Sequence, residues 1–209
     1  MPLQNRVNPW GGLDAVAARG AWLGNRGVLH DDQKRVVARW RTKAWITCEL
    51  HFRGVHRAVF SPHTWSELFF LDEATAFAAG HRPCAYCRRP RFNEFKRAWC
   101  AANAERLESP TPRMAWIDAQ LHAERVRRDG SKVTWMARLD QLPPGTFVAL
   151  DGGACLVWQN RLWPWSHWGY GAALPLPRAG MRVAVLTPRS IAAVFARGFR
   201  PQVHPSACA

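Results

Sequence analysis

"GHRPCAYCRR", residues Gly80 to Arg89, places two cysteines three positions apart between basic residues, directly after a short apolar run. A C-x-x-C pair is typical of a metal site, because a tight turn aims both sulfurs at one ion about 2.3 Å away. Pro83 restricts the turn before the first cysteine, and the flanking arginines favour the thiolate forms. The stretch therefore predicts half of a zinc site, formed by Cys84 and Cys87.

Two other interpretations of the pair stay open. A thioredoxin-like redox pair would need a strand before it and a helix that begins at the first cysteine, and the sequence matches that pattern poorly. Two buried thiols that bind no metal are also consistent with the spacing.

Strand and helix patterns alternate around the pair. "KAWITCELHFRGVHRAVF", residues 43–60, alternates around an Arg-Gly turn and predicts a β-hairpin. "ELFFL", residues 67–71, predicts a strand, and "DEATAFAAG", residues 72–80, predicts a short helix that ends at a glycine. "RFNEFKRAWCAANAERL", residues 91–107, predicts a longer helix that follows a proline.

The sequence "SPTP", residues 109–112, is the best internal boundary, since a helix does not cross such prolines. A third helix is expected over residues 113–128, followed by strand patterns with Asp-Gly and Asn-Arg turns and by a last helix. We therefore expect an α+β fold with a zinc-stapled β-hairpin and helix module in residues 1–108. A helix and a small carboxyl-terminal β-rich unit would occupy residues 113–209, with one continuous domain as the alternative.

The charge balance points to an anionic partner. Lysine and arginine total 29 against 15 aspartate and glutamate residues, which gives a net charge of +14. Such an excess favours association with phosphate backbones, so nucleic acid is the first partner to expect. An acidic protein partner is the alternative.

The sequence gives no sign of a membrane span or a leader. No apolar run approaches the ~18 residues that cross a bilayer. The start "MPLQNRVNPWGGL" lacks a basic segment followed by an apolar one, so we expect a cytoplasmic protein. Six cysteines with only two closely spaced argue against a disulfide framework in that reducing setting.

"FFLDEATAFAAGHRPCAYCRR", Phe69 to Arg89, resembles the second half of the metal-binding domain of the Ada-type DNA-repair methyltransferase family. In that family an aromatic strand, an alanine-rich helix and a Gly-aromatic-Arg-Pro-Cys-x-x-Cys motif follow one another. "GNRGVLHDD", Gly24 to Asp32, is similar to the stretch before the first ligands in small relatives of that domain. The resemblance covers residues 24–90 and implies zinc, a hairpin and helix geometry, and association with DNA.

By this resemblance Cys84 and Cys87 form the second ligand pair of the zinc site. Cys48, on the expected hairpin, would be the third ligand, although it can also be a small buried apolar residue. The fourth ligand would be one of His30, His51, His56 and His81. The match of "GNRGVLH" favours His30. In the family a ligand cysteine accepts a methyl group from a DNA phosphotriester, but the first cysteine pair that carries this chemistry is not matched here.

Twelve tryptophans are many for 209 residues, and several stand beside arginine. Most are expected in the core, but "RLWPWSHWGYG", residues 161–171, crowds aromatic rings around a proline and glycines and is expected to line a groove. The residues expected to contact nucleic acid are Arg82, Arg88, Arg89, Arg91, Trp163, Trp165, Trp168 and Tyr170.

"IDAQLHAER" places Asp118, His122 and Arg125 on one helical face. Together they can orient a general base beside a phosphate, so Asp118 and His122 are candidate catalytic residues. A surface ion pair is the simpler interpretation. No glycine-rich phosphate loop, nucleotide fingerprint or hydrolase motif accompanies them.

The sequence as a whole predicts a zinc-binding protein that engages nucleic acid, with DNA expected from the resemblance, through a basic and tryptophan-rich surface. The alternative is an enzyme that acts on DNA or nucleotides, as a nuclease, a glycosylase or an alkyl-group acceptor. In such an enzyme the Asp118 and His122 face and the tryptophan-rich loop should converge on one cavity. The oligomeric state is left open.

Overall fold

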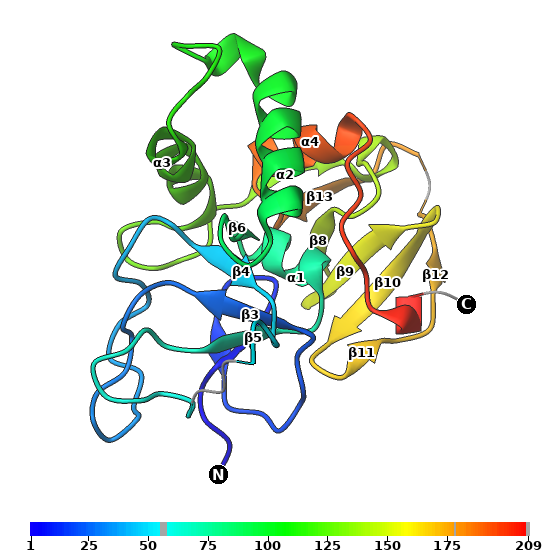
Figure 1. Cartoon of the computed structure of the whole chain (residues 1–209). Coiled ribbons are helices and arrows are strands. Elements are labelled where there is room, and N and C mark those ends of the chain that lie inside the picture. Colours follow the sequence, from blue (N-terminus) through cyan, green and yellow to red (C-terminus); the bar gives the residue numbers. More distant parts are fainter. Residues whose placement is uncertain (55–57, 178, 208–209) are drawn as a thin grey trace.

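The computed structural model describes residues 1–54, 58–177 and 179–207. Within these ranges two β-sheets lie on either side of helix α1 (Glu73–Ala78), and helices α2, α3 and α4 lie together at one end (Figure 1). The fold is therefore of the mixed α+β class that the sequence predicts.

The first sheet has the strand order β2-β1-β5-β3-β4-β6. Its strands are β1 (Arg6–Val7), β2 (Leu13–Asp14), β3 (Trp22–Asn25), β4 (Ile46–Cys48), β5 (Leu68–Phe70) and β6 (Arg82–Pro83). Gly24 on β3 is required where the strand crosses an aromatic ring, because a Cβ there would lie 2.4 Å from Cε2 of Phe70. The close approach lets β3 sit between β5 and β4 in the sheet centre.

The hairpin predicted over residues 43–60 is not formed by the described residues. β4 pairs with β3 in antiparallel fashion and with β6 in parallel, and no strand occurs in residues 49–54 or 58–60. The alternating pattern was correct for β4 itself, but both of its hydrogen-bonding edges are occupied by strands from distant parts of the chain. The predicted turn runs into residues 55–57, which lie outside the described ranges, as does His56.

Helix α1 is the central element of the molecule, and all six of its residues are buried. Asp72 caps its start by accepting the Thr75 N–H at 2.8 Å. Ala76 packs with the apolar residues of the first sheet, whereas Ala74 packs with those of the second. The predicted helix at 72–80 is thus confirmed, and it ends at Gly80, which has φ +86°.

Three longer helices follow or flank this centre. Helix α2 (Arg89–Ala102) and helix α3 (Met114–Arg125) were predicted close to their observed bounds, and α4 (Arg189–Ala196) precedes a glycine as expected. Phe77 of α1 joins Phe95, Ile117 and Ile191 of these helices in one buried apolar cluster. Short 3-10 turns occur at Ala104–Arg106, Leu139–Gln141 and Pro205–Ala207.

The second sheet has the order β11-β10-β9-β8-β13-β7, and β12 also pairs with β10. Its strands are β7 (Trp135–Arg138), β8 (Phe147–Leu150), β9 (Gly153–Trp158), β10 (Arg161–Ser166), β11 (Gly169–Tyr170), β12 (Leu174–Pro175) and β13 (Arg182–Val185). The expected Asp-Gly turn is present, with positive φ at Asp151 and Gly152. Strands β8, β9, β10 and β13 match the prediction, whereas β7 was not foreseen.

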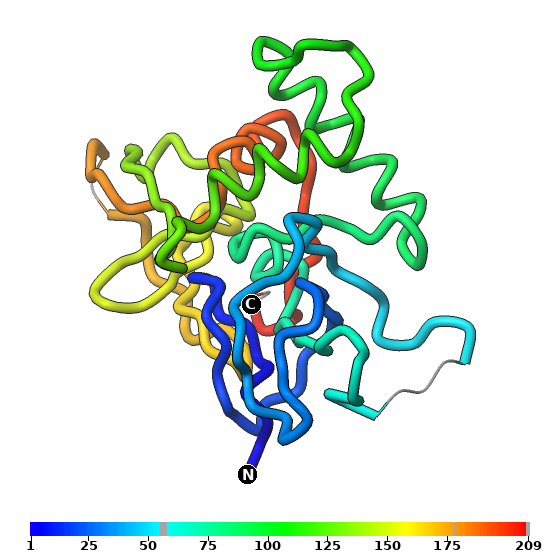
Figure 2. The backbone as a smooth tube through the Cα atoms, turned by 90° about the vertical axis from the view of Figure 1, so that its left-hand side faces the viewer, coloured from blue at the N-terminus to red at the C-terminus, as the bar shows by residue number. Residues whose placement is uncertain are grey.

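The carboxyl-terminal segment returns from α4 to the centre of the molecule, as the red trace in Figure 2 shows. There His204 N–H donates to Asp72 Oδ2 at 3.0 Å, and Tyr170 N–H donates to Ser206 Oγ at 2.8 Å. His204 is thereby bound to the cap of α1. No helix in the described ranges is long and apolar enough to cross a membrane.

Apolar clusters cross the boundary expected at residues 109–112. Leu71 and Ala74 share a cluster with Phe147 and Leu156 of the second sheet. A second cluster joins α1 and α2 to α3 and α4. Residues from both sides of the prolines thus build the same interior.

Candidate metal centre

Three cysteines from two separate segments meet beside the first sheet. Cys48 is the last residue of β4, and Cys84 and Cys87 follow β6 directly. The two strands pair in parallel with Thr47 opposite Pro83, and the Cys84 N–H donates to the Thr47 carbonyl at 2.9 Å. This register brings Cys84 to the level of Cys48, so the three sulfurs lie within 4.8 Å of one another.

The C-x-x-C turn directs a backbone donor at sulfur. Tyr86 N–H donates to Cys84 Sγ at 3.3 Å, and Arg88 N–H donates to the Cys84 carbonyl at 3.2 Å, which closes the turn. Helix α2 then begins at Arg89. A donor aimed at sulfur stabilises negative charge there, and the thiolate is the form that binds metal.

Contacts among the three thiols shift their pKa values. Hydrogen bonds from Cys48 and then Cys87 lower the pKa of Cys84, whereas the contact with Cys84 raises the pKa of Cys48. All three are free cysteines. A cation between the sulfurs would take the place of the shared protons.

The donor set fits a soft or borderline metal ion. Three thiolates favour zinc, copper(I) or an iron–sulfur group over the oxygen-loving magnesium and calcium. Thiolates on a tetrahedral zinc ion stand roughly 3.8 Å apart, as bonds of about 2.3 Å require. The separation of at most 4.8 Å is compatible with this after small side-chain movements.

The sulfurs face a cavity of about 530 Å³. Apolar side chains such as Leu23, Ile46 and Phe69 form part of its wall, and Glu49 and His51 also line it. The centre is thus open on one side to a space that a ligand can enter, rather than enclosed by protein on all sides.

The structure does not bring the favoured fourth ligand to the cysteines. His30 is buried against Phe60, and its ring nitrogens lie 2.6 Å from Ser66 Oγ and 3.1 Å from the Ser61 carbonyl. His81 is buried and accepts a hydrogen bond from Arg26. In the described ranges the close group of metal-ligand atoms contains only the three cysteines.

Three of the four arginines expected to contact nucleic acid lie in internal ion pairs. Arg82 donates two hydrogen bonds to Asp118, at 2.8 and 2.7 Å. Arg88 and Arg91 each donate to Glu73 at 2.7 Å. Arg89 alone of the four is exposed. The sequence pattern identified basic residues near the knuckle, the C-x-x-C turn of residues 84–87. Buried carboxylates from other elements neutralise most of these basic residues.

The tryptophan-rich segment is also mainly internal. Trp163 is buried, Trp165 Nε1 donates to Thr75 Oγ1 at 3.1 Å, and Tyr170 OH donates to Asp72 Oδ2 at 2.7 Å. Only Trp168 projects from the surface, with 67% of its area exposed. Trp165 and Tyr170 anchor the second sheet to α1, because their polar tips find partners at Thr75 and Asp72.

The two candidate catalytic residues on α3, Asp118 and His122, bond to different arginines and not to each other. Both Asp118 oxygens accept from Arg82, whereas His122 Nδ1 accepts from Arg125 Nη2 at 3.0 Å. Burial, together with the positive charge of Arg125 and then Lys43, lowers the pKa of His122 to about 4. The carboxylate therefore does not orient the imidazole.

Comparison of the chain with protein-family models, with curated proteins and with solved structures found no significant match. The kinship with the Ada-type metal-binding domain therefore stays a prediction that rests on the residues quoted for it.

Sequence reasoning missed an exposed aromatic and cationic group beside the cysteines. The Arg53 guanidinium carbon lies 5.2 Å from the Phe52 ring centre and 5.6 Å from that of Tyr86, and Arg53 Nη1 donates to Tyr86 OH at 3.3 Å. Tyr86 is 65% exposed. Its position between the two cysteines of the knuckle is a signal that could have identified it.

Proposed function

We propose that the chain binds one zinc ion through Cys48, Cys84 and Cys87 and engages nucleic acid, in particular DNA, beside that centre. The observation that carries the proposal is the convergence of three free sulfurs from β4 and the knuckle within 4.8 Å. Such convergence is rarely needed for packing alone, and three thiolates suit zinc.

The fourth zinc position would be filled by water or by a group that enters the adjoining cavity. Zinc with three protein ligands and one exchangeable position acts as a Lewis acid and lowers the pKa of a bound water. Glu49 and His51 line the same cavity and carry side-chain groups of the kind that bind zinc.

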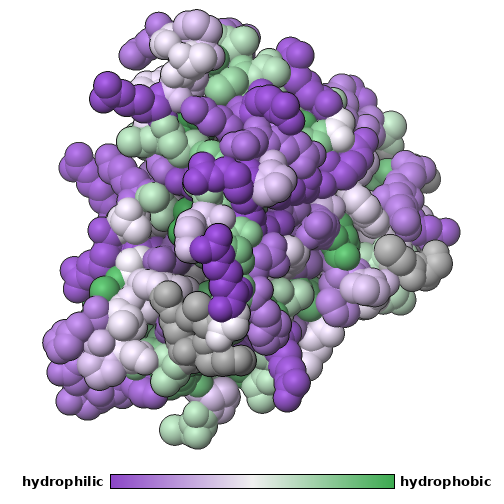
Figure 3. Space-filling view, viewed as in Figure 1, coloured by the Kyte–Doolittle hydropathy of each residue, from purple (hydrophilic) through white to green (hydrophobic). Residues whose placement is uncertain are grey.

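Two features support nucleic acid as the partner. The net charge is +14, and hydrophilic side chains cover most of the face seen in Figure 3. Tyr86 and Arg53 form an exposed ring and guanidinium pair beside the knuckle, which suits base stacking and phosphate contact. The proposed surface thus replaces the tryptophan-rich segment with the group around Tyr86.

The alternative of an enzyme that uses Asp118 and His122 has weaker support. Two cavities bear on this alternative, one at the cysteines and one beside Trp10 and Lys132. Neither is lined by Asp118, His122 or Trp165. Convergence on one cavity was the feature expected of that enzyme.

Metal analysis of the purified chain tests the zinc proposal. We expect one zinc per chain in the wild type and loss of that zinc in Cys84→Ser and Cys48→Ser. Cys155→Ser is the matched control, because Cys155 is a buried free cysteine in the second sheet and is expected to keep the metal. A wild type that folds without metal, or equal zinc in all variants, would overturn the proposal.

Fluorescence anisotropy with labelled single- and double-stranded oligonucleotides tests the partner. We expect affinity to fall between about 50 and 200 mM salt. Tyr86→Ala should weaken binding at least about fivefold, since a stacked ring contributes about 1 kcal/mol or more per base. Trp168→Ala, which removes a similarly exposed ring in the turn between β10 and β11, should have little effect. A larger loss in Trp168→Ala than in Tyr86→Ala would favour the tryptophan-rich surface instead.

A further inference from the structure

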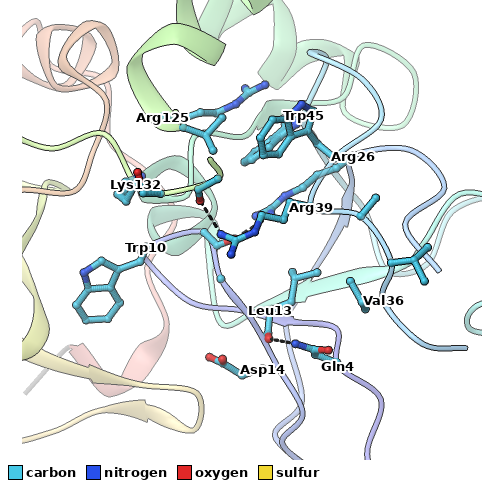
Figure 4. A pocket seen from close by; sticks show the side chains of 18 residues that line it. Gln4, Trp10, Leu13, Asp14, Arg26, Val36, Arg39, Trp45, Arg125 and Lys132 are labelled. Atoms are coloured by element: carbon cyan, nitrogen blue, oxygen red, sulfur yellow. Dashed lines mark hydrogen bonds between the residues drawn. The ribbon is translucent and has the colours of Figure 1, made fainter. Parts of the chain in front are cut away.

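A second cavity of about 720 Å³ lies away from the cysteines and shares no lining residue with theirs. Several parts of the chain form it, among them the turn around Trp10 and Gly11, residues 36–40, and the end of α3 with the following turn to Lys132, together with Arg26 and Trp45 (Figure 4).

Two buried arginines enclose one tryptophan at this cavity. The guanidinium carbons of Arg26 and Arg125 lie 3.9 and 4.0 Å from the Trp45 ring centre. Arg26 is 1% exposed and Arg125 is 2% exposed. Lys132, which is partly buried, adds a third cation to the same wall.

All hydrogen-bond partners of these cations are uncharged. Arg26 donates to His81 Nε2 at 3.1 Å and to the Gly11 carbonyl at 2.8 Å. Arg125 donates to the carbonyls of Gly80 and Lys43 and to His122, and Lys132 donates to the Ala78 carbonyl. Within the described ranges no carboxylate forms an ion pair with any of the three.

Two buried donors are left without any partner. Arg26 Nη2 and Arg125 Nε are both inaccessible and form no hydrogen bond with any part of the chain that the structure describes. Gly11, a cavity residue with φ +83°, lies beside this first donor, since a Cβ there would be 3.8 Å from Arg26 Nη2. An unpaired buried guanidinium donor is costly, and a ligand oxygen would remove that cost.

The other buried arginines of the same molecule show the usual solution. Arg82 and Arg88 are also buried, and each is paired with a carboxylate, Asp118 and Glu73 respectively, although Arg88 Nη1 has no partner among the described residues. Burial first, and then the mutual repulsion of the cations, lowers the pKa of Lys132 and that of Arg125. Asp14 lines the far part of the cavity, but its carboxylate accepts from Asn8 and His167.

We propose that this cavity binds a phosphomonoester of nucleotide size, with the phosphate at the wall formed by Arg26 and Lys132, where a small side-chain movement would bring it to Arg26 Nη2, and the flat part of the ligand against the tryptophans. A phosphomonoester is close to a dianion at neutral pH and matches several cations better than a single carboxylate does. Trp10 and Trp40 line the cavity and supply faces for stacking. Arg39, which is exposed and donates to the Gly130 carbonyl at 2.7 Å, lies at the rim and extends the positive wall.

Two sources can supply the phosphate: a free nucleotide or the 5′-phosphorylated end of a nucleic acid strand. The inference does not depend on zinc, because the two cavities are separate. Titration calorimetry on the full chain with adenosine 5′-monophosphate, adenosine and inorganic phosphate tests the site. Oligonucleotides with a 5′-phosphate or a 5′-hydroxyl distinguish the sources, since tighter binding of the phosphorylated strand than of the mononucleotide favours the strand end.

Lys132→Met should weaken binding of adenosine 5′-monophosphate at least about tenfold, the loss of one charge-assisted hydrogen bond. Without ligand, the melting temperature of this variant should be unchanged or higher, because a repelling cation is removed. Arg39→Ala, at the exposed rim, should also weaken binding and gives a second variant that leaves the interior intact. Arg97→Ala, an exposed arginine on α2, is the matched control and should bind as the wild type does.

Binding of adenosine 5′-monophosphate with none of adenosine would support the proposal. Absence of binding by the mononucleotide, by millimolar phosphate and by the phosphorylated strand would overturn it. Equal affinity in Lys132→Met, Arg39→Ala and the wild type would also overturn it, since the ligand would then bind elsewhere. Tighter binding of citrate than of any phosphate would refute the phosphate assignment.

Discussion

Arg82 and Arg26 are both buried arginines, but they differ in whether a carboxylate neutralises their charge. Arg82 donates to both oxygens of the Asp118 carboxylate, so its charge is neutralised inside the protein. Among the residues that the structure describes, the partners of Arg26 are an imidazole, a carbonyl and the Trp45 ring. The first is a structural ion pair, whereas the second retains a donor for a ligand.

Asp118, which the sequence predicted as a catalytic candidate, instead forms an ion pair that we expect to stabilise the fold. Asp118→Asn tests that expectation. Removal of the carboxylate charge leaves Arg82 buried and uncompensated, which should lower the free energy of unfolding by about 3–5 kcal/mol. Asp140→Asn removes the partner of the surface residue Arg138 and should change stability far less. Both are measured by denaturant unfolding, and similar small losses in the two variants would contradict this account.

At the scale of elements, the ends of α1 and α4 are both followed by a glycine with positive φ. Gly80 has φ +86° and Gly198 has φ +96°. Their surroundings differ, because a Cβ on Gly80 would lie 2.5 Å from Arg125 Cδ, whereas a Cβ on Gly198 would meet open space. Gly80 thus both ends α1 and makes room for the arginine that lines the cationic cavity.

Gly80→Ala should therefore be more harmful than Gly198→Ala. Each substitution places a side chain in a left-handed conformation at a cost of about 1–2 kcal/mol. At Gly80 overpacking against Arg125 adds about 1–3 kcal/mol. Equal losses of unfolding free energy in the two variants would show that the contact with Arg125 is relaxed without cost.

The sequence indicated the elements better than their partners. The helices α1 to α4 and strands β8 to β10 follow from local periodicity, caps and turn residues, which act within a few positions. The pairing of β4 with β6 joins residues 46–48 to 82–83, and no local pattern encodes it. For the same reason Cys48 could be placed with the knuckle by resemblance, whereas the surroundings of His30 could not be foreseen.

At the scale of the whole molecule, buried positive charge should make stability depend on pH. Burial, followed by repulsion from Arg26, Arg125 and Lys132, lowers the pKa of His81 well below its ordinary value of about 6.5. The unfolded chain takes up a proton at this residue below that pH, whereas the folded chain does not. Stability should therefore be retained above about pH 6.5 and should fall as the pH decreases, by up to about 1.4 kcal/mol per unit for this group.

Denaturant unfolding at about pH 7.5 and about pH 5.5 measures this dependence. His81→Asn removes the titrating group and should reduce the loss between the two pH values. His122→Asn is a useful comparison, since His122 is less buried and its pKa is also lowered. The same pH dependence in the wild type and His81→Asn would rule out His81 as its source.

The proposed binding of one metal ion by two chain segments connects these scales, since it depends on three side chains, on the β4 and β6 register and on the fold around α1. X-ray absorption at the zinc edge of the purified full chain tests it most directly. We predict three sulfur neighbours at about 2.3 Å and one nitrogen or oxygen neighbour at about 2.0–2.1 Å. A first shell made only of nitrogen and oxygen would contradict the account.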